Sequence, residues 1–130
     1  MLALDSNTLI YYFKGVGRVA EHLQATPPRE IGIPSIVLYE LEVGLGRLGQ
    51  REHRRRELAQ LLQLVRILPF DESSARAAAG IRVRLETLGM PIGPLDTLIA
   101  GTALGHGAVL VTHNTGEFHR VPGLTVMDWF

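Results

Sequence analysis

Three carboxylates, Asp5, Glu40 and Asp96, stand within otherwise apolar segments of the sequence. None of them has a lysine or arginine within four residues on either side. A charged side chain in such surroundings is rarely buried unless it is paired or binds a cation. If the three side chains meet in one crevice, they predict an acidic pocket that holds a metal ion.

Charge repulsion decides which chemistry such a pocket supports. Two carboxylates about 4 Å apart repel by ~4 kcal/mol at an effective dielectric constant of about 20. Several in one crevice must therefore become neutral or share a cation. Oxygen ligands favour Mg²⁺ or Mn²⁺, which would neutralise charge on a phosphodiester and activate water for hydrolysis.

Each acid also has a structural alternative. Asp5 can cap a following helix, although Ser6 and Asn7 beside it can do the same. Asp96 would be favoured in the first turn of a helix by the helix dipole. Glu40 can lie on the surface of an amphipathic helix. For any single residue, these alternatives remain open.

Alternating strand and helix patterns predict the elements that position these acids. Apolar runs predict about five short strands, at residues 2–4, 30–33, 64–68, 108–112 and 124–127. Apolar spacing predicts helices at residues 7–13, 19–23, 35–48, 52–64, 73–88 and 96–104. Ser35 is the expected N-cap of the third helix. The alternation indicates one α/β domain over residues 1–130, with a central, mainly parallel sheet flanked by helices.

A parallel sheet would bring distant acids together. The carboxyl ends of its strands share one edge, where the ligand crevice lies. Asp5 ends the first strand, and Thr112, Asn114 and Glu117 follow the fourth. Asp96 begins a helix, and helix starts on that edge face the same crevice.

Composition narrows the class of protein. The chain has 130 residues, of which 46% are hydrophobic, and this suffices for a folded core. The absence of cysteine excludes disulfides, a thiol nucleophile and a thiolate zinc site, and it is compatible with the cytoplasm. We expect neither a secretory signal nor a membrane span.

Basic charge is concentrated in one segment, although the formal net charge is zero. Residues 47–56 carry one glutamate and five arginines, namely Arg47, Arg51, Arg54, Arg55 and Arg56. Such a segment can contact RNA phosphates or the acids of a protein partner. A solvated helix face is the alternative.

Two other patterns give weaker signals. Residues 44–49 have the glycine spacing of a dinucleotide fingerprint, but Pro34 indicates a helix start before them and Pro69 stands where an acid is needed. A Ser-His-Asp arrangement from Ser35, His113 and Asp96 lacks the Gly-x-Ser-x-Gly elbow. His113 adjoins the predicted site and could contact a substrate.

At the end of the chain, Trp129 and Phe130 are expected to pack on the sheet without a chemical role.

Four segments resemble, in order, the four acidic blocks of PIN domains. They are residues 4–7 (Leu-Asp-Ser-Asn), 35–41 (Ser-Ile-Val-Leu-Tyr-Glu-Leu), 92–100 (Ile-Gly-Pro-Leu-Asp-Thr-Leu-Ile-Ala) and 111–118 (Val-Thr-His-Asn-Thr-Gly-Glu-Phe). Residues 120–124, Arg-Val-Pro-Gly-Leu, look like the VapC toxin branch of that family.

The resemblance implies a toxin ribonuclease of a type II toxin–antitoxin pair. It implies Mg²⁺ or Mn²⁺ held by acids that match Asp5, Glu40, Asp96 and Glu117. It also implies hydrolysis of RNA, with tRNA or another structured RNA as the substrate, a homodimer, and a toxin–antitoxin hetero-oligomer with a cognate VapB-like antitoxin. The expected substrate contacts are Ser6, Asn7, Thr112, Asn114 and Arg47.

Two departures from the family pattern leave a second function open. Glu117 replaces the aspartate of many PIN domains, and Leu95 stands where related toxins often have asparagine. A non-catalytic PIN-like binding module that acts through a DNA-binding partner, as in the similar Neisseria FitB proteins, is therefore the alternative.

Overall fold

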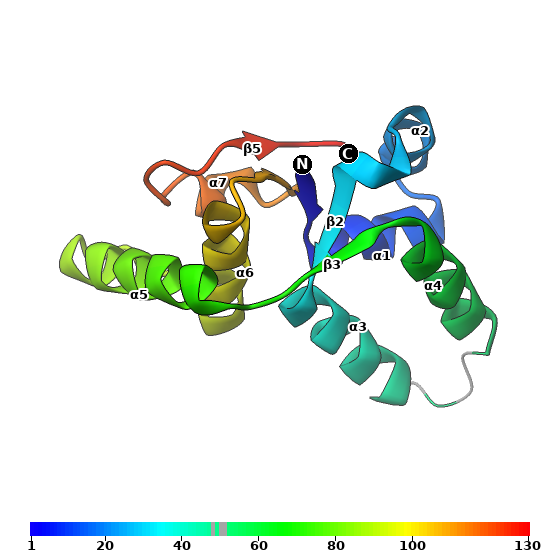
Figure 1. Cartoon of the computed structure of the whole chain (residues 1–130), viewed down its shortest axis with the longest axis horizontal. Coiled ribbons are helices and arrows are strands. Elements are labelled where there is room, and N and C mark those ends of the chain that lie inside the picture. The colour runs from blue at the N-terminus through cyan, green and yellow to red at the C-terminus, as the bar shows by residue number, and fades with distance from the viewer. Residues whose placement is uncertain (48, 50–51) are drawn as a thin grey trace.

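The computed structural model describes residues 1–47, 49 and 52–130, and it forms an α/β fold around a five-stranded sheet (Figure 1). The strand order is β3-β2-β1-β4-β5, and every neighbouring pair is parallel. The strands are β1 (Leu2–Leu4), β2 (Ile31–Pro34), β3 (Arg66–Leu68), β4 (Val109–Val111) and β5 (Val126–Met127). The predicted fold class is therefore confirmed.

Helices connect the strands and cover the sheet. They are α1 (Ser6–Lys14), α2 (Val19–Ala25), the 3-10 helix η1 (Pro28–Glu30), α3 (Ser35–Arg47), α4 (Glu52–Leu64), α5 (Glu72–Thr87), α6 (Pro94–Gly105) and α7 (Thr115–Phe118). In Figure 1, α5 and α6 lie together on the left and α4 lies on the right. Within the described ranges, none of these helices has the length and apolar character needed to cross a membrane.

The pairing of β1 with β4 determines where the site forms. Leu4 is in register with Val111, so Asp5 and Thr112 leave the sheet side by side. The backbone N–H of Asp5 continues the ladder by donating to the Val111 carbonyl at 3.1 Å. Leu4 and Val111 are fully buried, so apolar packing holds this register.

Several boundaries differ from those predicted. The strand expected from residue 64 begins at Arg66, because the Val65 N–H still donates to the Leu61 carbonyl of α4 at 3.2 Å. Helix α6 begins at Pro94, which places Asp96 inside its first turn. Helix α7 was not predicted, because a four-residue helix has no apolar period to reveal it.

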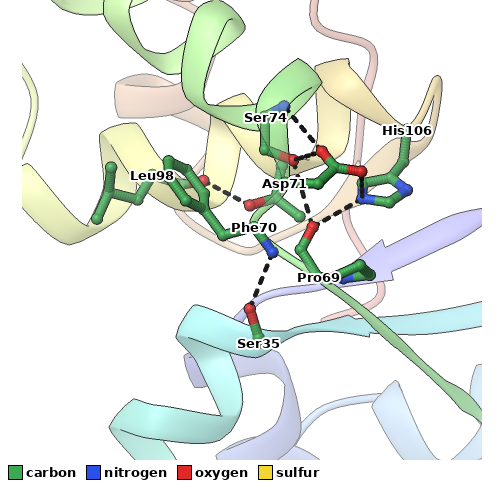
Figure 2. Close-up of polar contacts among 8 residues, drawn as sticks. Ser35, Pro69, Phe70, Asp71, Ser74, Leu98 and His106 are labelled. Atoms are coloured by element: carbon green, nitrogen blue, oxygen red, sulfur yellow. Dashed lines mark hydrogen bonds and ion pairs between the residues drawn. The ribbon is translucent and has the colours of Figure 1, made fainter.

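Ser35 was expected to cap α3, and this was wrong. Because β2 leads directly into the helix, Ser35 is the first helical residue. Its hydroxyl oxygen accepts a hydrogen bond from the Phe70 N–H at 3.2 Å and so ties α3 to the segment after β3 (Figure 2). The predicted end of this helix, Leu48, lies outside the described residues.

The same segment anchors the ends of α5 and α6 (Figure 2). Asp71 caps α5, since its Oδ1 accepts from the Ser74 N–H at 3.0 Å and from the Ser74 hydroxyl at 2.9 Å. His106, which follows α6, places Nε2 2.9 Å from the Pro69 carbonyl oxygen. The His106 contact fixes the end of α6, the helix that carries Asp96, against the segment after β3.

Close packing of α5 on α6 gives a testable prediction. A Cβ added at Gly101 of α6 would lie 2.5 Å from Cβ and 2.8 Å from Cα of Ala78. We expect Gly101→Ala to lower the free energy of unfolding by about 1–3 kcal/mol, because the two backbones must separate.

Gly80→Ala is the matched control, because a Cβ there meets nothing within 4 Å inside α5. It should raise the free energy of unfolding by roughly 0.5–1 kcal/mol. Urea denaturation measures both values. A Gly101→Ala protein as stable as the unmodified chain would contradict the close packing.

Candidate functional site

Asp5 is buried where β1 ends and α1 begins. Its side chain is only 4% exposed, and Oδ1 accepts a hydrogen bond from the Thr8 N–H at 2.8 Å. The predicted capping role is thus real. Burial raises the pKa of Asp5, while hydrogen bonds from Thr112 and Thr8 act in the opposite direction and the charge of Asp128 adds to the rise. The Asp5 carboxylate therefore caps α1 and also has a raised pKa.

Glu40 lies on the face of α3 that turns towards α1. Its carboxylate Oε1 accepts a hydrogen bond from the Ser6 hydroxyl at 2.5 Å, and the residue is half-buried. Glu40 is therefore neither fully buried nor freely solvated, and its carboxylate is held by α1. Ser6 follows Asp5 directly, so the contact places Glu40 next to the end of β1.

Glu117 brings the fourth acid to the start of α6. Its Oε1 accepts from the Gly93 N–H at 3.1 Å, and its Oε2 accepts from the Asn114 side-chain amide. Asp96 lies one turn beyond Gly93, and its Oδ2 is 3.5 Å from where a Cβ at Gly93 would stand. The short helix α7 therefore positions Glu117 against Asp96.

Charge couples the four acids into one group. The pKa of Asp96 is raised to about 7, first by burial, then by the charge of Glu117 and the hydrogen bond with it, and then by the charges of Glu40 and Asp5. We call Asp5, Glu40, Asp96 and Glu117 the acidic cup. The structure thus brings together all four residues that the sequence predicted as catalytic.

The acidic cup is not a preformed metal cage. Among the described residues, no group of three or more acidic, histidine or cysteine side chains is arranged to hold an ion as it stands. Charge repulsion acts over longer distances than coordination bonds. The four carboxylates can therefore raise the pKa of Asp96 without lying close enough together to coordinate one ion as they stand. Oxygens of three of the acids are occupied by hydrogen bonds from the chain.

Three of the five predicted substrate contacts lie beside these acids. Ser6 bonds to Glu40, Asn114 bonds to Glu117, and Thr112 leaves the sheet next to Asp5. Thr112 also accepts from the Asn114 N–H at 3.0 Å, which links the residues around two of the acids. Asn7 is exposed in the first turn of α1.

A cavity of about 380 Å³ opens beside the cup between α1, α3 and α4. Ser6, Asn7 and Glu40 line it together with apolar side chains and two cations, Lys14 and Arg54. Sequence reasoning missed Lys14, although its spacing from Asn7 places both on one face of α1.

The arginines of residues 47–56 lie in different environments. Arg54 faces the cavity, with its guanidinium 5.0 Å from the centre of the Phe13 ring and Nη1 3.5 Å from Glu57. Arg55 pairs with Glu42, and Arg56 is exposed. Arg47, a predicted substrate contact, is exposed at the end of α3 and is not among the residues that line the cavity. Arg51 lies outside the described residues.

The weaker motifs have no support in the structure. Gly44 and Gly46 lie inside α3 rather than after a strand, which excludes the dinucleotide fingerprint. Ser35 and His113 bond to Phe70 and Asp128, so they form no nucleophile–base pair with each other.

Comparisons with known proteins identify the family. The family model described as PIN domain matches residues 2–124. A tRNA(fMet)-specific endonuclease VapC from Salmonella typhimurium is 34% identical over 127 residues, which cover 97% of this chain and 96% of that protein.

Solved structures agree with this assignment. A chain of VapBC2 from Rickettsia felis, bound to a DNA fragment from its promoter, has a TM-score of 0.91 at 31% identity, covering 99% of this chain and 98% of that one. A chain of FitAcB from Neisseria gonorrhoeae has a TM-score of 0.87 at 30% identity, covering 98% and 96%. The resemblance seen in the four acidic segments is confirmed, and the chain belongs to the VapC branch of the PIN-domain family.

Proposed function

We propose that this protein is a Mg²⁺- or Mn²⁺-dependent endoribonuclease toxin of the VapC type that is neutralised by a VapB-like antitoxin. The observation that carries the proposal is the acidic cup. In it, the charges of Asp5, Glu40 and Glu117 add to the effect of burial and raise the pKa of Asp96. The Salmonella typhimurium relative is named as a tRNA(fMet)-specific endonuclease, so we propose tRNA or another structured RNA as the substrate.

The chemistry of the cup suits a divalent cation. All its donors are carboxylate oxygens, the ligands that Mg²⁺ and Mn²⁺ favour. The ion pairs found among residues 1–47, 49 and 52–130 include none of the four acids, so the described chain does not neutralise them. A bound cation would supply that charge, polarise the phosphodiester and activate water.

The residues of the chain supply positioning. Hydrogen bonds from Thr8, Ser6 and Asn114 hold Asp5, Glu40 and Glu117, so these acids are oriented before substrate arrives. Water attacks phosphorus in line with the leaving 3′ oxygen, the P–O3′ bond breaks, and the products are a 5′-phosphate and a 3′-hydroxyl. Lys14 and Arg54 can bind a neighbouring phosphate in the cavity beside Glu40.

We also propose two protein partners, an antitoxin and a second copy of the chain. The Rickettsia felis structure contains a VapBC complex on promoter DNA, and on that likeness we propose a VapB-like antitoxin for this chain. Val83, Leu88 and Met90, on or just after α5, are large apolar side chains that remain exposed. A second copy of the chain would cover them, giving a homodimer within a toxin–antitoxin hetero-oligomer.

A non-catalytic binding module is the second candidate. The likeness to FitAcB and the absence of a preformed cage within the described part of the chain favour it. Leu95 and Glu117, which depart from the family pattern, favour it too.

Removing one charge from the cup tests the nuclease. Asp5→Asn, Glu40→Gln and Asp96→Asn should each lower RNA cleavage by at least about 100-fold, because the cation loses a ligand. Glu42→Gln is the matched control, since Glu42 lies on the same helix as Glu40 but is exposed and pairs with Arg55. Cleavage is measured on labelled tRNA with Mn²⁺ and with a chelator. Full activity of Asp5→Asn or Asp96→Asn would refute the assignment.

Calorimetric titration with Mn²⁺ separates the two candidates. The unmodified protein should bind the ion, whereas Asp96→Asn should bind it at least about tenfold more weakly because a charged ligand is lost. A protein that takes up neither Mn²⁺ nor Mg²⁺ and cleaves no RNA would be the binding module.

The raised pKa of Asp96 predicts a cost to stability. The folded protein holds this proton more tightly than the unfolded chain, so stability falls as the pH rises from about 4 to about 7. At pH 8, Asp96→Asn should therefore raise the free energy of unfolding by about 1–2 kcal/mol. The full pKa shift implies more, but Asp96 is only half-buried and solvent screens its charge.

Urea denaturation at pH 4 and pH 8 without divalent cations measures this effect, which should vanish at the lower pH. Glu86→Gln, on the exposed face of α5, is the control and should show no such pH dependence. A destabilised Asp96→Asn protein at pH 8 would contradict the raised pKa of Asp96.

A further inference from the structure

Next to the acidic cup, His113 forms one end of a stack of rings. Its imidazole lies parallel to the Phe130 ring, with 4.1 Å between centroids and an angle of 20°. Tyr11 contacts both rings edge-on, at 6.0 Å from His113 and 5.0 Å from Phe130. Phe130 also lies against Gly17, where an added Cβ would be 2.9 Å from the ring. We call the face of the His113 ring that points away from Phe130 its outer face.

Hydrogen bonds fix the plane of the His113 ring. His113 Nδ1 is 3.0 Å from Asp128 Oδ2, and the other carboxylate oxygen accepts from the Phe130 N–H at 2.9 Å. The Phe130 carbonyl accepts from the Arg18 N–H at 2.9 Å. With these contacts made, the His113 side chain is still 44% exposed. Close to half of the side-chain surface of this oriented ring is therefore open to solvent.

The residues on either side of His113 in the sequence place the stack beside the acidic cup. Thr112 precedes His113 and lies next to Asp5 where β1 and β4 end, while Asn114 follows His113 and hydrogen-bonds to Glu117. Parallel pairing of β4 with β5 brings Asp128 and Phe130 to the same edge. A ligand on the open face of His113 would therefore adjoin a phosphodiester bound at the cup.

We propose that the outer face of His113 binds one unpaired RNA base next to the scissile phosphate. The inference rests on the proposed ribonuclease function and names a substrate contact for that site. Unpaired bases stack on aromatic and histidine side chains, which is how proteins commonly read RNA loops. Stacking needs no positive charge, so it suits a position whose neighbours are acids.

Two substitutions at one position separate stacking from the bond to Asp128. His113→Leu removes the flat ring, and His113→Phe keeps a flat ring without the nitrogen. If the base stacks, His113→Leu should weaken RNA binding about 5- to 100-fold, and His113→Phe should bind within about threefold of the parent. Tyr39→Leu is the control, because Tyr39 is an aromatic residue on α3 that is 57% exposed.

The assay uses fluorescence anisotropy with a short unstructured RNA, in the Asp96→Asn background where cleavage is not expected. A series of RNAs with 2-aminopurine at each position in turn gives a second signal, because stacking quenches this base. We expect quenching at one position, with its loss in His113→Leu and its return in His113→Phe. Thermal unfolding confirms that each variant is folded.

Equal weakening by His113→Leu and His113→Phe would overturn the proposal and assign His113 a purely positioning role through Asp128. Unchanged RNA binding in His113→Leu would overturn it too. If the same variant binds the antitoxin more weakly, the outer face of His113 contacts the protein partner instead of RNA. RNA that stacks on His113 but is never cleaved by the unmodified protein would refute the nuclease while supporting the stack. RNA that is cleaved but does not stack on His113 would support the nuclease and refute the stack.

Discussion

Repulsion among four carboxylates is the constraint around which this edge of the sheet is organised. The parallel register of β1 and β4 places Asp5 beside Thr112, and α3, α6 and α7 each add one further acid. Nearby donors then hold Asp5, Glu40 and Glu117 in position. The pKa of Asp96 is raised to about 7, first by burial and then by the charges of the other three acids.

Rigid packing elsewhere allows this unfavourable arrangement to persist. Helix α6 is buried along much of its length, and close approach at Gly101 brings it against α5. His106 ties the far end of α6 to Pro69 and Asp71, which belong to the segment after β3 (Figure 2). Asp96 therefore stays near the other acids because its helix has little freedom to move away. Such local destabilisation at a site, offset by a well-packed scaffold, is common in enzymes.

The sequence predicted the sheet and the acids well, because short apolar runs and lone charges are local signals. Asp5, Glu40 and Asp96 stood out without reference to any partner residue, whereas Glu117 was assigned through the family pattern. The contacts of Ser35 with Phe70 and of His113 with Phe130 were not foreseen, because they join segments that only the tertiary fold brings together. Phe130 was expected to pack on the sheet, but it is 42% exposed and supports His113 at the edge of the site.

Crystals grown with Mn²⁺ test most directly whether the acidic cup exists to hold a cation. Anomalous scattering measured near the manganese absorption edge locates the ion without reference to activity. We expect a peak inside the cup, contacted by carboxylate oxygens of Asp5 and Asp96. A well-ordered structure with no anomalous density between these side chains, at a Mn²⁺ concentration that saturates related sites, would contradict the proposed metal-dependent function.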